Sequence, residues 1–441
     1  GGGAGSLQVL YSFTNGSDGS QPFAGLTADP DGNLYGVASA GGDSGAGTVF
    51  ELVRTDSSYA FRRLYSFSGG EDGAEPVAGL VIDRAGNLYG STARGGAGGS
   101  GTVFELGAGP SGYSLTTLYA FSAVSSGTNA DGAFPEAPLL RDRFGNLFGT
   151  AAGGGPSGDG AVFELARGNA GYSFSVLHAL GGGGDGAFPV GGLVSDRAGN
   201  LFGTASGNPA AGLWGTVFEI SSVSRSPVYR TLYAFQDGND GALPYASLII
   251  DSSGDLIGTA AAGGESGAGT IFELAPAGSD FAFRLLYSFA GGFDGGLPAG
   301  GVAADSAGRL YGTTMSDGLF GWGTVFALSP PPSADDRVVF TDAGAPVAIA
   351  LSAHDPGLPG ASFTYAIETP PQHGTLTPIV DGITTYTPGP DFSGSDAFTY
   401  TATDAGGTSN PATVIVSAGS RGSSKIQPVA PVRPASVESP P

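Results

Sequence analysis

Three residue types are missing or nearly missing from this chain of 441 residues, which has no cysteine, one methionine and one lysine, Lys425. Without cysteine the chain cannot form disulfides, zinc–thiolate sites or a cysteine nucleophile. Its only lysine lies close to the C-terminus, so the rest of the chain has none for Schiff-base chemistry. These absences remove several classes of enzyme.

Positive charge and long apolar runs are also scarce. The chain has 17 basic and 39 acidic residues, for a net charge of −22. Such a surface repels nucleic acid and anionic membranes, so we expect no nucleic-acid partner. No apolar run approaches the roughly 20 residues of a membrane helix, so we expect no membrane insertion. The chain opens with glycines instead of Met, which fits a mature, exported bacterial protein after signal removal.

Glycine and proline are abundant, with 81 and 30 residues, yet hydrophobic residues still make up 40% of the chain, enough for large cores. The glycines belong to a repeat that recurs six times up to about residue 328. Each copy carries five markers in the order LYxF, Asp-Gly, Pro, Asp-x-x-Gly and G-[TA]-[VI]-F. Successive LYxF tetrads lie 54, 54, 59, 55 and 54 residues apart.

The second copy predicts how one repeat folds. Its four short strand signals are Ala78–Asp83, Asn87–Ser91, Gly101–Leu106 and Tyr113–Phe121, with turn residues between them. Four antiparallel strands in a unit of this length are typical of a propeller blade, and six units predict six blades. A solenoid is the alternative, but its terminal repeats would be atypical caps. We therefore predict an all-β fold, a six-bladed β-propeller followed by a small Ig-like β-sandwich.

The ends of the repeat array predict how such a ring closes. A lone fourth strand, Leu7–Phe13, precedes the first copy, and the last copy stops after its third strand at Val325–Leu328. We expect the N-terminal strand to complete the last blade, because this pairing leaves no open sheet edge.

Each copy also has a glycine inside its second strand, Gly90 in the second copy. A glycine there lets an aromatic ring lie flat against the backbone, and Phe104 and its equivalents are the expected rings. Together, GNLYG at Gly86–Gly90 and GTVFEL at Gly101–Leu106 resemble the bacterial GloVer tandem repeat, over about residues 7–328. The resemblance implies an exported, often surface-anchored protein with no shared established activity.

A change of composition divides the chain after the repeats. We predict a propeller at residues 1–329, a Pro-rich linker at 330–336, a β-sandwich at 337–418 and a Pro/Ser/Val-rich tail at 419–441. The sandwich has seven strand signals, and PPQHGTLT together with YTPGPDFSGSDAFTYTATD looks like bacterial Ig-like or cadherin-like modules, which usually act as spacers or adhesive units. The tail is expected to be an extended linker, or else an added strand on a neighbouring subunit.

The six Asp-Gly aspartates are the candidate metal ligands. If they surround one mouth of the channel they could hold a cation, and calcium is the possible cofactor. The alternative is turn chemistry repeated six times. These residues are Asp18, Asp72, Asp131, Asp185, Asp240 and Asp294.

Other candidates are weaker. Trp214 and Trp322 precede third strands and could stack on sugars or fill gaps between loops. The glutamate of GTVFEL recurs in five copies, where arginines such as Arg63, Arg230 or Arg284 could pair with it. Glycoside hydrolysis needs two carboxyl groups about 5–10 Å apart, which repeat-equivalent positions do not supply. His178 replaces the tyrosine of LYxF and is expected to be a packing variant.

These observations favour a non-enzymatic, exported structural or interaction protein of the cell surface or extracellular matrix. It would contact a surface or matrix component or assemble with copies of itself, including as fibres. The alternative is a glycan-binding, hydrolase-type or lyase-type propeller that uses the axial channel. No catalytic residue is predicted.

Overall fold

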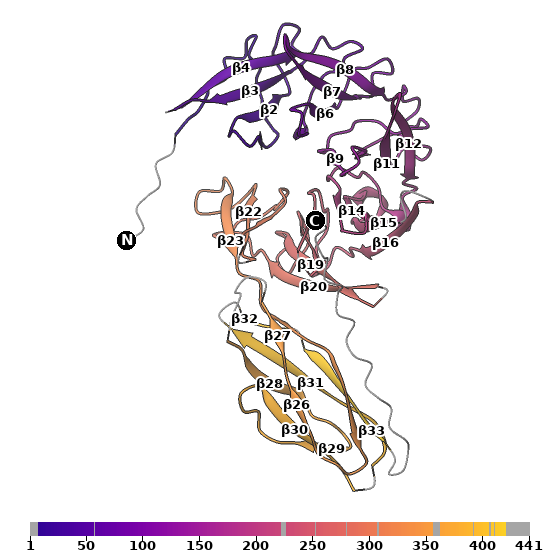
Figure 1. Cartoon of the computed structure of the whole chain (residues 1–441), viewed down its shortest axis with the longest axis vertical. Coiled ribbons are helices and arrows are strands. Elements are labelled where there is room, and N and C mark those ends of the chain that lie inside the picture. The colour runs from indigo at the N-terminus through magenta and orange to yellow at the C-terminus, as the bar shows by residue number, and fades with distance from the viewer. Residues whose placement is uncertain are drawn as a thin grey trace, which may run out of the picture. The chain divides into compact units, whose positions relative to one another are not determined.

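Each repeat forms one antiparallel sheet whose strands follow the chain order. The computed structural model describes residues 8–56, 58–221, 226–251, 253–278, 280–306, 308–355, 362–390, 392–404, 407–409 and 411–419. The chain divides into two compact units. The first consists of Gly1–Ala303 and Tyr311–Ala327, and the second consists of Ala304–Leu310 and Leu328–Pro441. Within the described residues the repeats form five four-stranded sheets and one three-stranded sheet, coloured from indigo to orange in Figure 1. The all-β prediction is confirmed, and the sheets have the form of propeller blades.

The strands of the first three repeat sheets are as follows. The first sheet holds β1 (Thr27–Ala28), β2 (Leu34–Ala38), β3 (Thr48–Arg54) and β4 (Tyr59–Ser66). The second holds β5 (Val81–Ile82), β6 (Leu88–Thr92), β7 (Thr102–Gly109) and β8 (Gly112–Ala120). The third holds β9 (Leu140–Arg141), β10 (Leu147–Ala151), β11 (Ala161–Gly168) and β12 (Gly171–Ala179).

The remaining repeat sheets follow the same order. The fourth holds β13 (Val194–Ser195), β14 (Leu201–Ala205), β15 (Thr216–Ser221) and β16 (Val228–Ala234). The fifth holds β17 (Ile249–Ile250), β18 (Leu256–Ala260), β19 (Thr270–Ala277) and β20 (Asp280–Ser288). The sixth holds β21 (Ala303–Ala304), β22 (Leu310–Thr314) and β23 (Thr324–Leu328). Two single turns of 3-10 helix, Gly183–Asp185 and Pro209–Ala211, lie in loops of the fourth repeat.

All four strands predicted for the second copy are present, but the first is shorter than expected. β5 covers only two residues of the predicted Ala78–Asp83. Pro76 packs on Gly47 of the previous sheet, where an added Cβ would lie 2.5 Å from the Pro76 Cδ. The chain before β5 therefore packs against the neighbouring sheet, and proline cannot donate to a ladder.

The predicted contact between glycine and phenylalanine is confirmed. Gly90 lies directly opposite Phe104 in the β6–β7 ladder. A Cβ at Gly90 would lie 2.7 Å from the Phe104 Cζ, so only glycine leaves room for the ring. Gly36, Gly149, Gly203, Gly258 and Gly312 make the same contact with their own phenylalanines.

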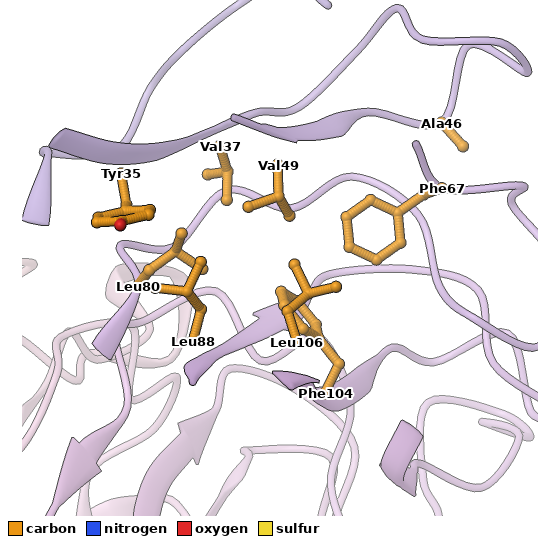
Figure 2. Packing of buried hydrophobic residues seen from close by; sticks show 9 residues of the cluster. All are labelled: Tyr35, Val37, Ala46, Val49, Phe67, Leu80, Leu88, Phe104 and Leu106. Atoms are coloured by element: carbon orange, nitrogen blue, oxygen red, sulfur yellow. The ribbon is translucent and has the colours of Figure 1, made fainter. Parts of the chain in front are cut away.

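Consecutive sheets bury a shared apolar core. Figure 2 shows Tyr35, Val37, Ala46, Val49 and Phe67 of the first repeat facing Leu80, Leu88, Phe104 and Leu106 of the second. The Phe67 and Phe104 rings meet edge to face with centroids 5.3 Å apart. Such a pair contributes about 0.5–1.5 kcal/mol beyond its buried area. The same aromatic contact joins the later sheets, as in Phe121–Phe163 and Phe289–Phe326.

A backbone hydrogen bond reinforces each of these joints. The Glu75 N–H donates to the Ala46 carbonyl at 3.0 Å, and the Phe134 N–H donates to the Ser100 carbonyl at 2.9 Å. Five residues donate in this way, Glu75, Phe134, Phe188, Leu243 and Leu297. Each has a positive φ, between 54° and 59°, which is uncommon for residues other than glycine. Gln21, the equivalent residue of the first repeat, has a φ of 57° although no described sheet precedes it.

The two ends of the repeat array differ from its interior. Residues 8–13 form no strand, and Leu7 lies outside the described residues. Among the described residues, nothing pairs with the outer edge of β23. Val325 on β23 is 84% exposed, whereas its five equivalents in the other repeats are fully buried. The predicted pairing of the N-terminal segment with the last sheet is therefore absent from the described contacts.

The second unit contains all seven predicted sandwich strands, together with three short ones. Its strands are β24 (Ser333–Ala334), β25 (Arg337–Asp342), β26 (Val347–Ala350), β27 (Ala353–His354), β28 (Thr364–Thr369), β29 (Gly374–Leu376), β30 (Ile383–Pro388), β31 (Gly394–Asp404), β32 (Gly407–Thr408) and β33 (Ala412–Gly419). One sheet has the order β25-β33-β31-β28 and the other β26-β30-β29.

The sandwich core includes Ile349, Tyr386, Phe398, Tyr400 and Val414. β25 and β33 pair in parallel, whereas the other ladders of these two sheets are antiparallel. The linker expected at 330–336 is partly structured, because β24 pairs with β27. The predicted tail lies outside the described residues after Gly419.

Candidate functional site

The six Asp-Gly aspartates each face the LYxF tetrad that comes just before them in the chain. Tyr65 donates its hydroxyl to Asp72 Oδ2 at 3.0 Å, and the Ser68 N–H donates to the same oxygen at 2.7 Å. We call this tyrosine–aspartate pair the repeat contact. It recurs as Tyr11–Asp18, Tyr119–Asp131, Tyr233–Asp240 and Tyr287–Asp294. In the fourth repeat His178 takes the place of tyrosine, 3.2 Å from Asp185, and stacks on Tyr229.

These hydrogen bonds stabilise the charged carboxylates. A side-chain hydrogen bond from Thr14 is the main cause that holds the pKa of Asp18 well below its ordinary value. Burial opposes the effect at Asp72, but hydrogen bonds from Ser68 and Tyr65 outweigh it and lower the pKa. Burial and the carboxylate of Asp72 raise the pKa of Tyr65 to about 12. Within the described residues, no group of three or more His, Cys, Asp or Glu side chains is arranged to hold a metal ion.

The glutamates of the third strands are buried, as Glu51 and Glu273 are, or half-buried, and three of them pair with an arginine of the neighbouring fourth strand. Glu219 pairs with Arg230 at 2.8 Å, and Glu273 pairs with Arg284 at 3.3 Å, as expected from the sequence. In the first repeat the partner of Glu51 is Arg62, and the prediction of Arg63 was wrong. A β-bulge between Val49 and Phe50 shifts the register and places Arg62 opposite Glu51. Arg63 pairs instead with Asp43, at 2.7 Å.

The two tryptophans lie in different environments. Trp214 packs against the core between the fourth and fifth sheets, as a gap-filling residue would. Trp322 is 90% exposed beside Phe320, which is 82% exposed. Only Trp322 is thus free to stack on a ligand from solution.

A pocket of about 460 Å³ lies along the segments that lead into the first strands of the later repeats. Its lining is mostly apolar, with Pro138, Val190, Val302 and the two tyrosines Tyr245 and Tyr311. None of the described residues that line it is a carboxylate, a histidine or an arginine.

A second pocket, of about 580 Å³, differs in chemistry. It lies between the second and third repeats and is lined by four arginines, together with Asp83, Ala85 and Asn87. We call it the arginine pocket. The four arginines are Arg84, Arg141, Arg143 and Arg167.

The sequence matches the family model of the Gloeobacter/Verrucomicrobia repeat over residues 2–207 and 167–365. This match covers more than half of the chain. The chain belongs to the Gloeobacter/Verrucomicrobia repeat family. The resemblance to the GloVer repeat is thereby confirmed. In this Gloeobacter/Verrucomicrobia repeat protein, residues 329–417 also match the bacterial Ig domain. Both families suggest an extracellular or surface protein.

Solved structures that are similar to this Gloeobacter/Verrucomicrobia repeat protein are distant. One is a putative oxidoreductase (glucose dehydrogenase) from Thermus thermophilus, with 17% identity, 70% of this chain and 96% of that chain covered, and a TM-score of 0.41. Another is an α-L-arabinofuranosidase from Clostridium thermocellum, with 10% identity, coverage of 62% and 94%, and a TM-score of 0.32. A third is a hypothetical selenium-binding protein from Sulfolobus tokodaii, with 11% identity, coverage of 84% and 86%, and a TM-score of 0.41.

At these TM-scores the similarities carry no argument about activity. No curated protein matches the chain. In the described part of this Gloeobacter/Verrucomicrobia repeat protein, no helix has the length and apolar character that a membrane crossing requires.

The arginine pocket is the feature of this repeat protein that sequence reasoning missed. A comparison of the repeats at the first strand would have found it. Arg141 takes the position that Ile82 and Ile250 occupy in the second and fifth repeats, where each packs against an apolar core. At the following turn, Phe144 stands where the second repeat has Ala85.

Proposed function

We propose that the protein is an exported, non-enzymatic structural and interaction protein of the cell surface or extracellular matrix. In this proposal its six repeats close into a ring, and the same joint between copies builds fibres. One observation carries the proposal: the two ends of the repeat array hold complementary halves of the joint that forms between consecutive sheets. The bacterial Ig-like domain supports an extracellular setting.

At the N-terminal end, residues before the first sheet already make the aromatic contacts of such a joint. Tyr11 stacks on Phe61 with centroids 4.1 Å apart, and the Phe13 ring meets Phe50 at 5.1 Å. Tyr119 and Phe121, at the end of a fourth strand, make the same two contacts with the next sheet. Residues 8–13 thus contact the first sheet as the end of a preceding fourth strand would.

The first repeat also holds an unused donor and an uncovered apolar side chain. Gln21 has a φ of 57°, like the five residues that donate to a preceding sheet. Leu26 is 50% exposed, whereas its equivalent Leu80 is 4% exposed beneath the preceding sheet. The segment around Gln21 therefore has the conformation of a joint without the neighbouring sheet.

The matching half lies on the sixth repeat. The Trp322 carbonyl occupies the position of the acceptors Ala46 and Ser100, and Gly323 occupies the position on which the next proline packs. The exposed Val325 and the outer edge of β23 would take up residues 7–13 as a fourth strand. Burying an apolar side chain of this size stabilises by about 1.5–3 kcal/mol. A head-to-tail joint of this kind closes a ring within one chain or extends a filament between chains.

Engineered cysteines test this joint directly, because the natural chain has none. Thr48 lies opposite Ser66 in the first sheet, so Thr324 would lie opposite Ser12 in a closed ring. We expect Ser12→Cys/Thr324→Cys to form a disulfide under mild oxidation. The matched control is Thr48→Cys/Ser66→Cys, at a pair that is already formed.

The products separate the outcomes on a non-reducing gel. A cross-linked monomer supports ring closure, and a ladder of cross-linked oligomers supports fibre assembly. If neither forms while the control pair cross-links, the proposed joint does not exist. Negative-stain images and light scattering, with and without residues 419–441, test self-assembly. A strictly monomeric particle that binds no cell-surface or matrix component contradicts the interaction role.

A glycan-binding or hydrolase-type or lyase-type propeller is the second candidate function. Two observations favour it: the aromatic lining of the 460 Å³ pocket by Tyr245 and Tyr311, and the 90% exposure of Trp322. Aromatic faces are common platforms for sugar rings. A glycan-array signal that Trp322→Ala abolishes, and that Trp214→Ala leaves in place, would support binding. Turnover of a bound sugar would contradict the non-enzymatic proposal.

A further inference from the structure

We propose that the arginine pocket between the second and third repeats binds a saccharide through a single anionic group, a carboxylate or a sulfate. This site is separate from the joint at the ends of the array, and the inference does not depend on ring closure. It rests on charge, on an unpartnered buried donor, and on an exposed aromatic ring.

The concentration of charge is the first observation. The chain has 16 arginines, since 17 residues are basic and Lys425 is the only lysine, and four of them line this one pocket. Asp83 is the only carboxylate in the lining. In the described residues, Arg84, Arg143 and Arg167 form no ion pair. Arg84, Arg143 and Arg167 are exposed to solvent, so this excess of three positive charges, in a protein of net charge −22, is open to an anion that enters the pocket.

Arg141 lies over the Tyr89 ring, 5.5 Å from its centroid, but its hydrogen-bond donors are not all used. Its nearest carboxylate oxygen is Asp83 Oδ2, 3.8 Å away, beyond hydrogen-bond distance. That oxygen already accepts hydrogen bonds from the Asn87 amide at 3.1 Å and the Tyr89 hydroxyl at 3.2 Å. The Arg141 Nε is buried and has no hydrogen-bond partner. A buried donor without a partner is costly, so a small movement of Arg141 that lets an anion accept a hydrogen bond from Nε would be favourable.

Gly145 allows two of the guanidinium groups to converge. A Cβ added at Gly145 would lie 3.1 Å from one terminal nitrogen of Arg167 and 3.2 Å from one of Arg141. The two like charges therefore approach the same point, where Gly145 has no side chain. Paired guanidinium groups bind carboxylate, sulfate or phosphate oxygens through charge-assisted hydrogen bonds.

Phe144 supplies a surface for a sugar ring. It is 68% exposed at the tip of the same turn, and the Arg143 guanidinium lies over its ring at 4.8 Å. The second repeat has Ala85 at this position, so the turn itself does not require an aromatic residue. An exposed ring beside an anion pocket matches a sugar that carries one acidic group.

The net charge of the chain favours a ligand with a single acidic group over a polyanion in the arginine pocket. Electrostatic screening at physiological salt extends over about 8 Å, so the pocket attracts a group that enters it. A long polyanion would extend across the acidic surface and be repelled there. We therefore assign the pocket to one acidic sugar on an otherwise neutral saccharide.

Glucuronate, inorganic sulfate, glucose and a heparin fragment are the probes, titrated into the full-length protein by calorimetry at constant ionic strength. We expect saturable binding of glucuronate, weaker binding of sulfate and no binding of glucose. Arg141→Gln and Arg167→Gln should each weaken glucuronate binding about tenfold or more, because each removes a charged hydrogen bond. Phe144→Ala should weaken glucuronate binding and leave sulfate binding unchanged.

Arg54→Gln is the matched control. The Arg54 side chain lies over Gly32 as the Arg167 side chain lies over Gly145. The backbone N–H of Arg54 donates to the Asn33 side chain, as the backbone N–H of Arg167 donates to the Asn146 side chain. Arg54 has no partner arginine, because Ala28 stands where the third repeat has Arg141. This variant should bind glucuronate normally, and thermal unfolding should show that every variant is folded.

Four results would overturn the proposal. The first is no glucuronate binding by the wild-type protein, and the second is an equal loss with Arg54→Gln. The third is sulfate binding as tight as that of glucuronate with no effect of Phe144→Ala, which would leave a simple anion site. The fourth is tighter binding of the heparin fragment than of glucuronate, which would contradict the assignment to a single acidic group.

Discussion

The repeat contact is expected to be a main source of stability, and the third repeat allows its strength to be measured. Tyr119 donates to Asp131 Oδ2 at 2.7 Å, and Asp131 is only 7% exposed. A hydrogen bond to a charged group contributes about 1.5–3 kcal/mol. We therefore expect Tyr119→Phe to lower the free energy of unfolding by that amount. The Ser122 N–H, at 2.9 Å, still holds the carboxylate in the variant.

A double-mutant cycle separates the contact from other effects of the substitutions. Tyr119→Phe, Asp131→Asn and the double variant are compared by urea unfolding at neutral pH, and we expect a coupling energy of about 1.5–3 kcal/mol. The fourth repeat is the internal control. There His178 lies 3.2 Å from Asp185, whose side chain is 42% exposed. Its coupling should be below about 1 kcal/mol, as for exposed pairs. A coupling below about 0.5 kcal/mol at Tyr119–Asp131, or equal couplings in the two repeats, would refute the reasoning.

Four further predictions follow from the same geometry. Gly90→Ala should lower the free energy of unfolding by about 1–3 kcal/mol, because the added methyl group overpacks against Phe104. Gly79→Ala is the control in the same urea assay. It should be nearly neutral, because its Cβ would have no neighbour closer than 3.8 Å. If the ring closes, Val325→Ala should lower the free energy of unfolding by about 2 kcal/mol, the same loss that is expected for the buried Val103→Ala, and a loss below about 0.5 kcal/mol would show that Val325 stays exposed. Hydrogen bonds lower the pKa of Asp18 below its ordinary 3.8, so the carboxylate stabilises the fold above that pH. Stability should fall as the pH drops below about 4, and Asp18→Asn should flatten this part of a plot of Tm against pH. Calcium should leave the Tm unchanged, because the repeat-contact aspartates already accept hydrogen bonds from the protein; a rise that Asp72→Asn removes would instead support a cation site.

Much of the fold could be predicted because the same turns and strands recur at equivalent positions of each repeat. The Asp-x-x-Gly turn and the first three strands of the repeat each occur six times, so local ambiguity in one copy is resolved by the others. The contact of Gly90 with Phe104 was predictable for the same reason, since a glycine inside a strand needs a packing explanation.

The candidate site was harder to predict, because it depends on departures from the repeat and on register. The bulge that places Arg62 opposite Glu51 adds one residue to a strand, and it recurs at the leucine of LYxF in all five four-stranded repeat sheets. Simple alternation along a strand does not predict this extra residue, so the register was missed. Arg141 was visible as an arginine at an apolar position, but only a structure shows that Arg167 lies beside it. The two tryptophans occupy equivalent positions, and the following sheet beside Trp214 explains why Trp214 is partly buried whereas Trp322 is exposed.

The parallel ladder between β25 and β33 determines how the Ig-like unit would respond to mechanical force. These strands pair over six residue pairs, from Arg337↔Val414 to Asp342↔Gly419. In a parallel pair, tension applied before β25 and after β33 pulls the two strands in opposite directions along their length. All the hydrogen bonds of the ladder are then strained together in shear, whereas a hairpin pulled at its open end would unzip one bond at a time. The unit should therefore resist a pull between its flanking segments better than a hairpin pulled at its open end would.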